Sequence, residues 1–95
     1  MAARVGFLTV HLCITDGMTL KDKRQVVRSV LNRTRERFNV AAAEVGCLDT
    51  PRRAELAFTA VSNDGRHVRE ALDAVLKAVN GEPRAVVEFA DIEVF

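Results

Sequence analysis

Basic residues recur at helical spacing in the first half of the chain, at Lys21, Arg24, Arg28 and Arg35. On a helix these positions form one exposed line. Such a line suits the phosphates of an RNA backbone, because each Lys or Arg displaces condensed counterions when it binds. A solvated helix face, whose long side chains cover apolar edges, would show the same spacing. The pattern therefore predicts either a phosphate-binding surface or an ordinary solvated helix, and the sequence leaves both open.

The segment around this line concentrates positive charge. Residues 20–38 contain seven basic and two acidic residues, including Lys23, Arg33 and Arg37, whereas the rest of the chain contains seven basic and eleven acidic residues. The net charge of +1 conceals this asymmetry. A concentrated basic stripe can bind phosphate where the average charge of a protein would not.

The start of the same segment offers a second place for an anion. Free backbone amides, the helix dipole and nearby basic side chains all favour a phosphate there. Thr19, with Asp22 three residues later, also resembles a capping box, so helix capping accounts for Thr19 equally well. The predicted RNA- or phosphate-binding residues are Thr19, Lys21, Lys23, Arg24, Arg28 and Arg35.

No other combination of residues indicates catalysis or metal binding. His11 and Cys13 share a face of a predicted strand, but Glu44 or Glu55 would give only a third ligand without a defined fourth. Ser62 lacks the glycines and the base of a nucleophile elbow. An acylphosphatase-like enzyme would need an Arg in the loop at 15–18, which has none. We therefore expect no catalytic residue, no cofactor and no small-molecule substrate.

Six elements must position these residues. Alternation predicts strands and a 3.6-residue period predicts helices. The predicted strands are 5–14, 40–48, 53–60 and 86–95, and the predicted helices are 20–37 and 65–79. In strand 40–48, consecutive alanines weaken the pattern, and the preferred register points Ala43, Val45 and Cys47 inward with Glu44 outward. The last strand slips near Glu88 and Phe89, which predicts a bulge.

The element order βαββαβ predicts an α+β protein with ferredoxin-like topology, in which a four-stranded antiparallel sheet carries both helices on one face. A length of 95 residues fits a single domain at 1–95. No apolar stretch is long enough to span a membrane, and the N-terminus lacks the pattern of a signal peptide, so we expect a cytoplasmic protein without a membrane partner. Cys13 and Cys47 lie in apolar settings without CxxC spacing, which favours buried, reduced thiols.

The sheet face without helices is a poor platform for RNA. Sheets that recognise RNA stack bases on aromatic residues of both central strands, whereas here strand 5–14 offers Phe7 and strand 53–60 offers none on this face. Its charged residues Arg53 and Glu55 are expected to pair across strands with Glu44. The face is otherwise partly apolar, so two copies could pair through it or through an edge strand.

Five short blocks of the sequence resemble the YlxP-like family of small bacterial proteins. The blocks are Thr-Leu-Lys-Asp-Lys-Arg at 19–24, Arg-Phe-Asn-Val at 37–40, Ala-Glu-Val at 43–45, Arg-Ala-Glu-Leu at 53–56 and Val-Ser-Asn-Asp at 61–64. The resemblance implies a ferredoxin-like fold. Family members are often encoded beside genes for transcription elongation, translation initiation and ribosome-binding factors, which implies a role in ribosome maturation or translation. The family has no known catalytic residues to carry over.

The sequence thus favours a non-enzymatic accessory protein that binds ribosomal RNA or a pre-ribosomal subunit through its basic helix. The alternative is a protein-interaction module that forms a homodimer through its open sheet face or an edge strand.

Overall fold

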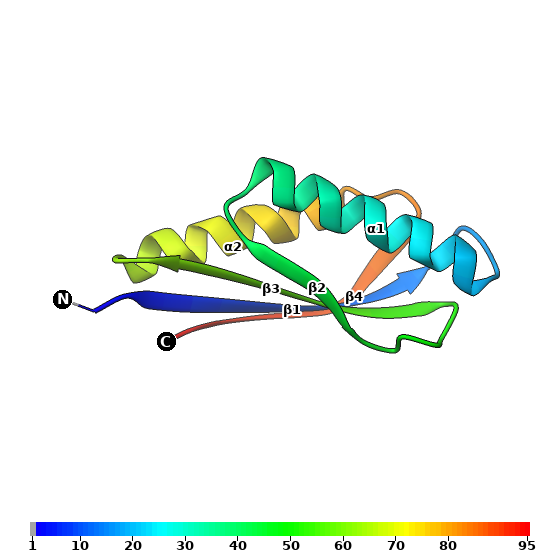
Figure 1. The fold of residues 1–95 in the computed structure, drawn as a ribbon, viewed down its shortest axis with the longest axis horizontal. Helices are drawn as coiled ribbons and strands as arrows, with labels where there is room; N and C mark the ends of the chain where they lie inside the picture. The colour runs from blue at the N-terminus through cyan, green and yellow to red at the C-terminus, as the bar shows by residue number, and fades with distance from the viewer. Residues whose placement is uncertain (1) are drawn as a thin grey trace.

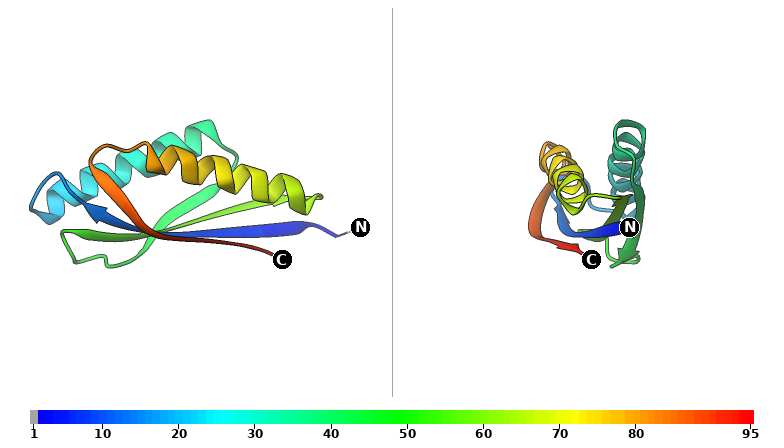
Figure 2. Two further views of the ribbon diagram at one scale, coloured as in Figure 1. Left: turned by 180° about the vertical axis from the view of Figure 1, so that it is seen from behind. Right: turned by 90° about the vertical axis from the view of Figure 1, so that its left-hand side faces the viewer.

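The computed structural model describes residues 2–95, which form a four-stranded antiparallel sheet with both helices on one face (Figure 1). The elements are β1 Arg4–Ile14, α1 Leu20–Arg37, β2 Ala41–Gly46, β3 Arg53–Ser62, α2 Gly65–Asn80 and β4 Ala85–Val94. The strand order β2-β3-β1-β4 places β1 and β3 in the centre. Figure 2 shows the molecule end-on, with the helices on one side of the sheet and the other side open. The predicted ferredoxin-like topology is confirmed.

The core lies between the helices and the inner face of the two central strands. Alternate residues of each strand point inward, because side chains in a strand change face at every position. The buried hydrophobic residues of these four elements are Leu8, Val10, Leu12 and Ile14 on β1, Ala54, Leu56, Phe58 and Ala60 on β3, Val26, Val27, Val30 and Leu31 on α1, and Val68, Leu72, Val75 and Val79 on α2. Each large aliphatic side chain in this set stabilises the fold by about 1.5–3 kcal/mol.

Gly6 allows α2 to approach β1 closely. A Cβ atom at this position would lie 2.2 Å from Cγ1 of Val68 and 2.8 Å from Cδ1 of Leu72. Both neighbours belong to the buried face of α2. Any side chain at Gly6 would therefore push the helix away from the sheet.

Helix α1 begins with the capping box that its sequence predicts. The hydroxyl of Thr19 accepts a hydrogen bond from the Asp22 amide at 3.1 Å, and the Asp22 carboxylate accepts from the amides of Thr19 and Met18 at 3.1 and 3.0 Å. These backbone hydrogen bonds, that from Met18 first, lower the pKa of Asp22. The first turn therefore already has its anion, supplied by the chain itself.

Strand β2 adopts the opposite register from the predicted one. Ala42 and Glu44 point toward the helices and are half-buried, whereas Ala43 and Val45 are exposed on the open face. The strand also ends at Gly46, so Cys47 falls in the loop with an exposed side chain and a left-handed φ of 58°. A slip of one residue exchanges the two faces of a strand, and three alanines give no preference between them. The predicted burial of Cys47 is wrong because the strand ends before this residue.

The bulge predicted in the last strand is confirmed. On β4, Phe89 pairs with His11 and Val87 pairs with Leu12, so Glu88 is the extra residue. This bulge turns Phe89 to the open face, where its ring centroid lies 5.1 Å from that of His11. The open face thus gains an aromatic residue that alternation alone did not predict.

Among residues 2–95, neither helix has the length and apolar character needed to cross a membrane.

Candidate nucleic-acid interface

Four of the predicted phosphate-binding residues lie along one exposed side of α1. We call Lys21, Arg24, Arg28 and Arg35 the basic ridge; all of them are exposed. The buried side of α1 carries Val26, Val30 and Thr34, and the ridge lies away from it. Within residues 2–95, no carboxylate pairs with Lys21, Arg24 or Arg28. The structure therefore brings this part of the predicted set together on one surface.

Arg35 anchors one end of the basic ridge beside the edge strand. Its guanidinium donates a hydrogen bond to the carbonyl of Ala42 on β2 at 2.5 Å and another to the side chain of Asn32 at 3.4 Å. The ridge therefore runs along the β2 side of α1. A charged side chain held at an edge strand also discourages pairing of that edge with another chain.

Lys23 does not belong to the interface, and its predicted phosphate contact is wrong. Its side chain has no exposed surface, and its ammonium lies 2.9 Å from the carboxylate of Glu44 on β2. The same ammonium donates to the carbonyls of Cys47, Leu48 and Arg53 at 2.6, 3.2 and 3.1 Å. These contacts occupy its donors completely.

The sequence did contain a signal for this burial. Lys23 precedes Val27, Val30 and Thr34 by 4, 7 and 11 positions, and all three residues are buried. That spacing places Lys23 on the inward stripe of α1. A buried ammonium needs a counter-charge, so Glu44 turns inward with it, which fixes the register of β2.

Thr19 also leaves the candidate interface. Its hydroxyl already accepts the Asp22 amide, and the Asp22 carboxylate occupies the position expected for a phosphate. A second anion at the same helix start would meet this negative charge at close range. The capping interpretation of Thr19 is therefore the one that the geometry supports.

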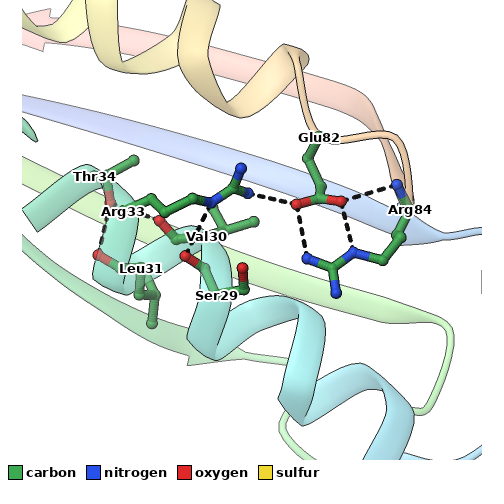
Figure 3. A network of polar contacts seen from close by, with 7 residues as sticks. All are labelled: Ser29, Val30, Leu31, Arg33, Thr34, Glu82 and Arg84. Carbon is green, nitrogen blue, oxygen red and sulfur yellow. Dashed lines mark hydrogen bonds and ion pairs between the residues drawn. The ribbon is translucent and has the colours of Figure 1, made fainter.

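A second buried carboxylate, absent from the sequence-based predictions, joins α1 to the loop after α2. Glu82 is 3% exposed and accepts from Arg33 at 2.5 Å and from the side chain of Arg84 at 2.8 and 3.1 Å (Figure 3). The Arg84 amide adds a bond at 3.0 Å. The side-chain hydrogen bonds from Arg84 are the main reason that the pKa of Glu82 falls to about 2.

This network assigns Arg33 a structural role rather than a place on the basic ridge. Arg33 also donates to the carbonyl of Ser29, one turn earlier on α1. Its partner Glu82 sits between a helix-ending glycine and a proline, where a sequence pattern suggests only a turn. Only the three-dimensional approach of α1 to this loop reveals the ion pairs.

The open sheet face has an acidic character. Asp91 and Glu93 on β4 stand beside Thr9 and Phe7 of β1, as the strand register shows. On the same face Arg53 forms an exposed ion pair with Glu88, and Nε2 of His11 lies 3.5 Å from the carboxylate of Glu55. The predicted pairing of Glu44 with Arg53 or Glu55 is wrong, because Glu44 faces Lys23 on the opposite side of the sheet.

Comparisons with known proteins agree with this fold. A family described as "Protein of unknown function (DUF503)" matches residues 5–94. The "Uncharacterized protein YlxP" of Bacillus subtilis (strain 168) is 33% identical over 79 residues, which cover 83% of this chain and 86% of that protein.

Solved structures show similarity in the fold alone. LarC2, the C-terminal domain of a cyclometallase involved in the synthesis of the NPN cofactor of lactate racemase, has a TM-score of 0.53 and 12% identity. The match covers 99% of this chain but 56% of that one. A putative chlorite dismutase has a TM-score of 0.55 and 13% identity, covering 96% of this chain and 43% of that one. The family match and the Bacillus relative together show that the chain belongs to the DUF503 family, as a YlxP-like small protein.

Proposed function

We propose that this protein is a non-enzymatic accessory factor that binds RNA through the basic ridge and acts in the cytoplasm on ribosomal RNA or a pre-ribosomal subunit. The observation that carries the proposal is the exposed line of Lys21, Arg24 and Arg28 without a paired carboxylate in residues 2–95. The choice of ribosomal RNA rests on the family resemblance. The ridge supplies positive charge but no side chain that reads a base.

The dimensions of the ridge suit an extended phosphate backbone. A helix rises about 1.5 Å per residue, so Lys21 and Arg35 are separated by roughly 21 Å along the axis of α1. Cations spread over that length can neutralise several successive phosphates. Binding of this kind weakens steeply as salt is added, because a higher salt concentration opposes the release of condensed counterions from the RNA.

Sedimentation with purified ribosomal subunits across a salt series tests the proposal. We expect co-sedimentation at low salt that is lost at high salt and in the Lys21→Glu/Arg24→Glu variant. Arg66→Glu/Arg69→Glu is the matched control, because it makes the same change of charge at exposed positions of α2. Thermal unfolding verifies that both variants fold. Equal loss of binding in the two variants, or no binding by the wild type, would refute the role of the ridge.

A second candidate function is self-association through the open sheet face. One end of this face carries Val5, Phe7, Val61 and Phe95, whose exposed fractions are 42%, 43%, 62% and 67%. Val5 on β1 pairs directly with Val61 on β3, and the amide of Phe95, the residue after β4, donates to the Val5 carbonyl, so these residues adjoin. An exposed apolar patch of this kind favours contact with another protein surface.

Light scattering at low and high salt tests this second candidate. We expect a dimer whose stability changes little with salt and which the Phe7→Ser variant dissociates. A monomer at every concentration would exclude the homodimer.

A further inference from the structure

A groove separates the C-terminal half of α1 from α2, on the helix side of the molecule. Two adjoining cavities of about 330 and 460 Å³ make up the groove, and both are lined by Arg37, Phe38 and Ala78. The first also contacts Val30, Arg33, Thr34 and Glu36, and the second also contacts Ala74, Lys77 and Gly81. The two helices run side by side over the sheet (Figures 1 and 2).

The groove combines an aromatic surface with positive charge. The guanidinium carbon of Arg37 lies 5.2 Å from the ring centroid of Phe38, in a cation–π contact. Lys77 and Arg37 have no carboxylate partner within residues 2–95, whereas Arg33 is neutralised by Glu82. Glu36 is the acidic residue of the lining, and it is exposed. The lining therefore suits a ligand that is both flat and anionic.

A nucleotide has these two properties. Bases stack on aromatic rings and on guanidinium planes, and phosphates bind Lys and Arg. Ligand sites in proteins typically have volumes of about 300–1,000 Å³, and each of the two cavities falls within that range. The base of a nucleotide in duplex RNA is already stacked on its neighbours and cannot enter the groove.

We infer that the groove holds one unpaired nucleotide of a single-stranded RNA, with its base against Arg37 and Phe38 and its phosphate near Lys77. This inference rests on the proposed function. The basic ridge lies on the β2 side of α1 and the groove on its α2 side. A helix is about 10 Å across, so a strand crossing α1 would contact both. The ridge supplies charge, and the groove selects single strands over duplexes.

Filling the groove without changing its charge provides the test. Ala74 lines the groove and is exposed, so Ala74→Leu adds bulk there at little cost to the core. The matched control is Ala74→Ser, which adds almost none. The probes are a short fluorescein-labelled oligouridylate and an RNA hairpin with a fully paired stem of the same length, both titrated by fluorescence anisotropy.

We expect Ala74→Leu to weaken oligouridylate binding about tenfold, as expected for loss of one stacked base, while hairpin binding and the salt dependence stay unchanged. Lys77→Gln should also weaken oligouridylate more than hairpin. Because Lys77 is exposed, this variant provides a second test if Ala74→Leu does not fold.

The outcomes separate the two proposals. Loss of binding in Lys21→Glu/Arg24→Glu with no effect of Ala74→Leu or Lys77→Gln would retain the ridge and overturn the groove. The converse result would overturn the ridge and retain the groove. Equal weakening of both probes by Ala74→Leu would also overturn the groove, and absence of RNA binding by the wild type would overturn both.

Discussion

The outer flank of α1 and the open face of the sheet carry opposite charges. The flank presents the basic ridge, of which Lys21, Arg24 and Arg28 lack a paired carboxylate in residues 2–95. The open face presents Asp91 and Glu93 beside exposed apolar residues. A net charge of +1 thus averages two surfaces that would attract different partners. Phosphate is attracted to the first surface and repelled by the second.

Two basic residues within a single turn of α1 also differ sharply in their exposure to a partner. Lys21 and Lys23 are two positions apart, yet Lys21 is exposed while Lys23 is enclosed between α1 and the β2–β3 hairpin. Side chains two positions apart on a helix do not share a face. Charge counted along the sequence therefore overstates the charge that a partner would meet.

Lys23→Ala should have the largest effect on the molecule. It leaves the Glu44 carboxylate without its ion pair and the carbonyls of Cys47 and Arg53 without their donor. Removing one partner of a buried ion pair costs about 3–5 kcal/mol of unfolding free energy. Urea unfolding measures the loss. Lys21→Ala, its exposed neighbour, should change stability by less than about 0.5 kcal/mol, and similar losses in both variants would contradict the assignment.

Glu82→Gln should cause the next largest loss of unfolding free energy. The lowered pKa of Glu82 also predicts that the stability of the wild type depends on pH. The folded pKa of Glu82 is about 2, below the ordinary value of 4.5, so its stabilisation is complete above pH 4.5 and is lost as the pH falls toward 2. The shift corresponds to roughly 3 kcal/mol.

Urea unfolding between pH 7 and pH 2.5 checks this prediction. The wild type should lose more stability over that interval than Glu82→Gln, which starts lower and declines less. Asp73→Asn, an exposed change on α2, serves as the control for charge alone. Parallel pH profiles for the wild type and Glu82→Gln would show that Glu82 does not contribute.

Neutralising charges on each of the two surfaces in turn sharpens the comparison between them. Arg28→Gln should reduce the slope of log affinity against log salt by about 0.7 for single-stranded RNA, because one fewer phosphate is neutralised. Asp91→Asn/Glu93→Gln on the open face should leave that slope unchanged. Anisotropy titrations with oligouridylate at several salt concentrations measure both. If Asp91→Asn/Glu93→Gln changed the salt slope as much as Arg28→Gln, the RNA would contact the open sheet face, which would contradict our proposal.

Arg53→Gln should have the smallest effect. Its ion pair with Glu88 lies on the open face, where the two side chains are 56% and 38% exposed. Exposed pairs contribute about 0–1 kcal/mol, since water already solvates both charges. Thermal unfolding should therefore shift little, and a loss comparable with that of Lys23→Ala would mean that this surface is more rigidly organised than its exposure suggests.

Features with a local cause were predictable from sequence. The span of α1, the Thr19 capping box and the bulge at Glu88 follow from residue types within a few positions of one another. The register of β2 was not predictable, because Ala41 to Ala43 carry no pattern and the deciding contact joins Glu44 to Lys23, in another element. Glu82 was missed for the same reason, since Arg33 reaches it from α1.

The enclosure of Lys23 has a consequence for chemical labelling. Amine-reactive reagents require an uncharged, accessible amine, so they should modify Lys21 and Lys77 in the folded protein and leave Lys23 untouched. Lys23 becomes reactive only when the β2–β3 hairpin separates from α1. Its rate of modification, read by mass spectrometry, would therefore report how often this part of the molecule opens.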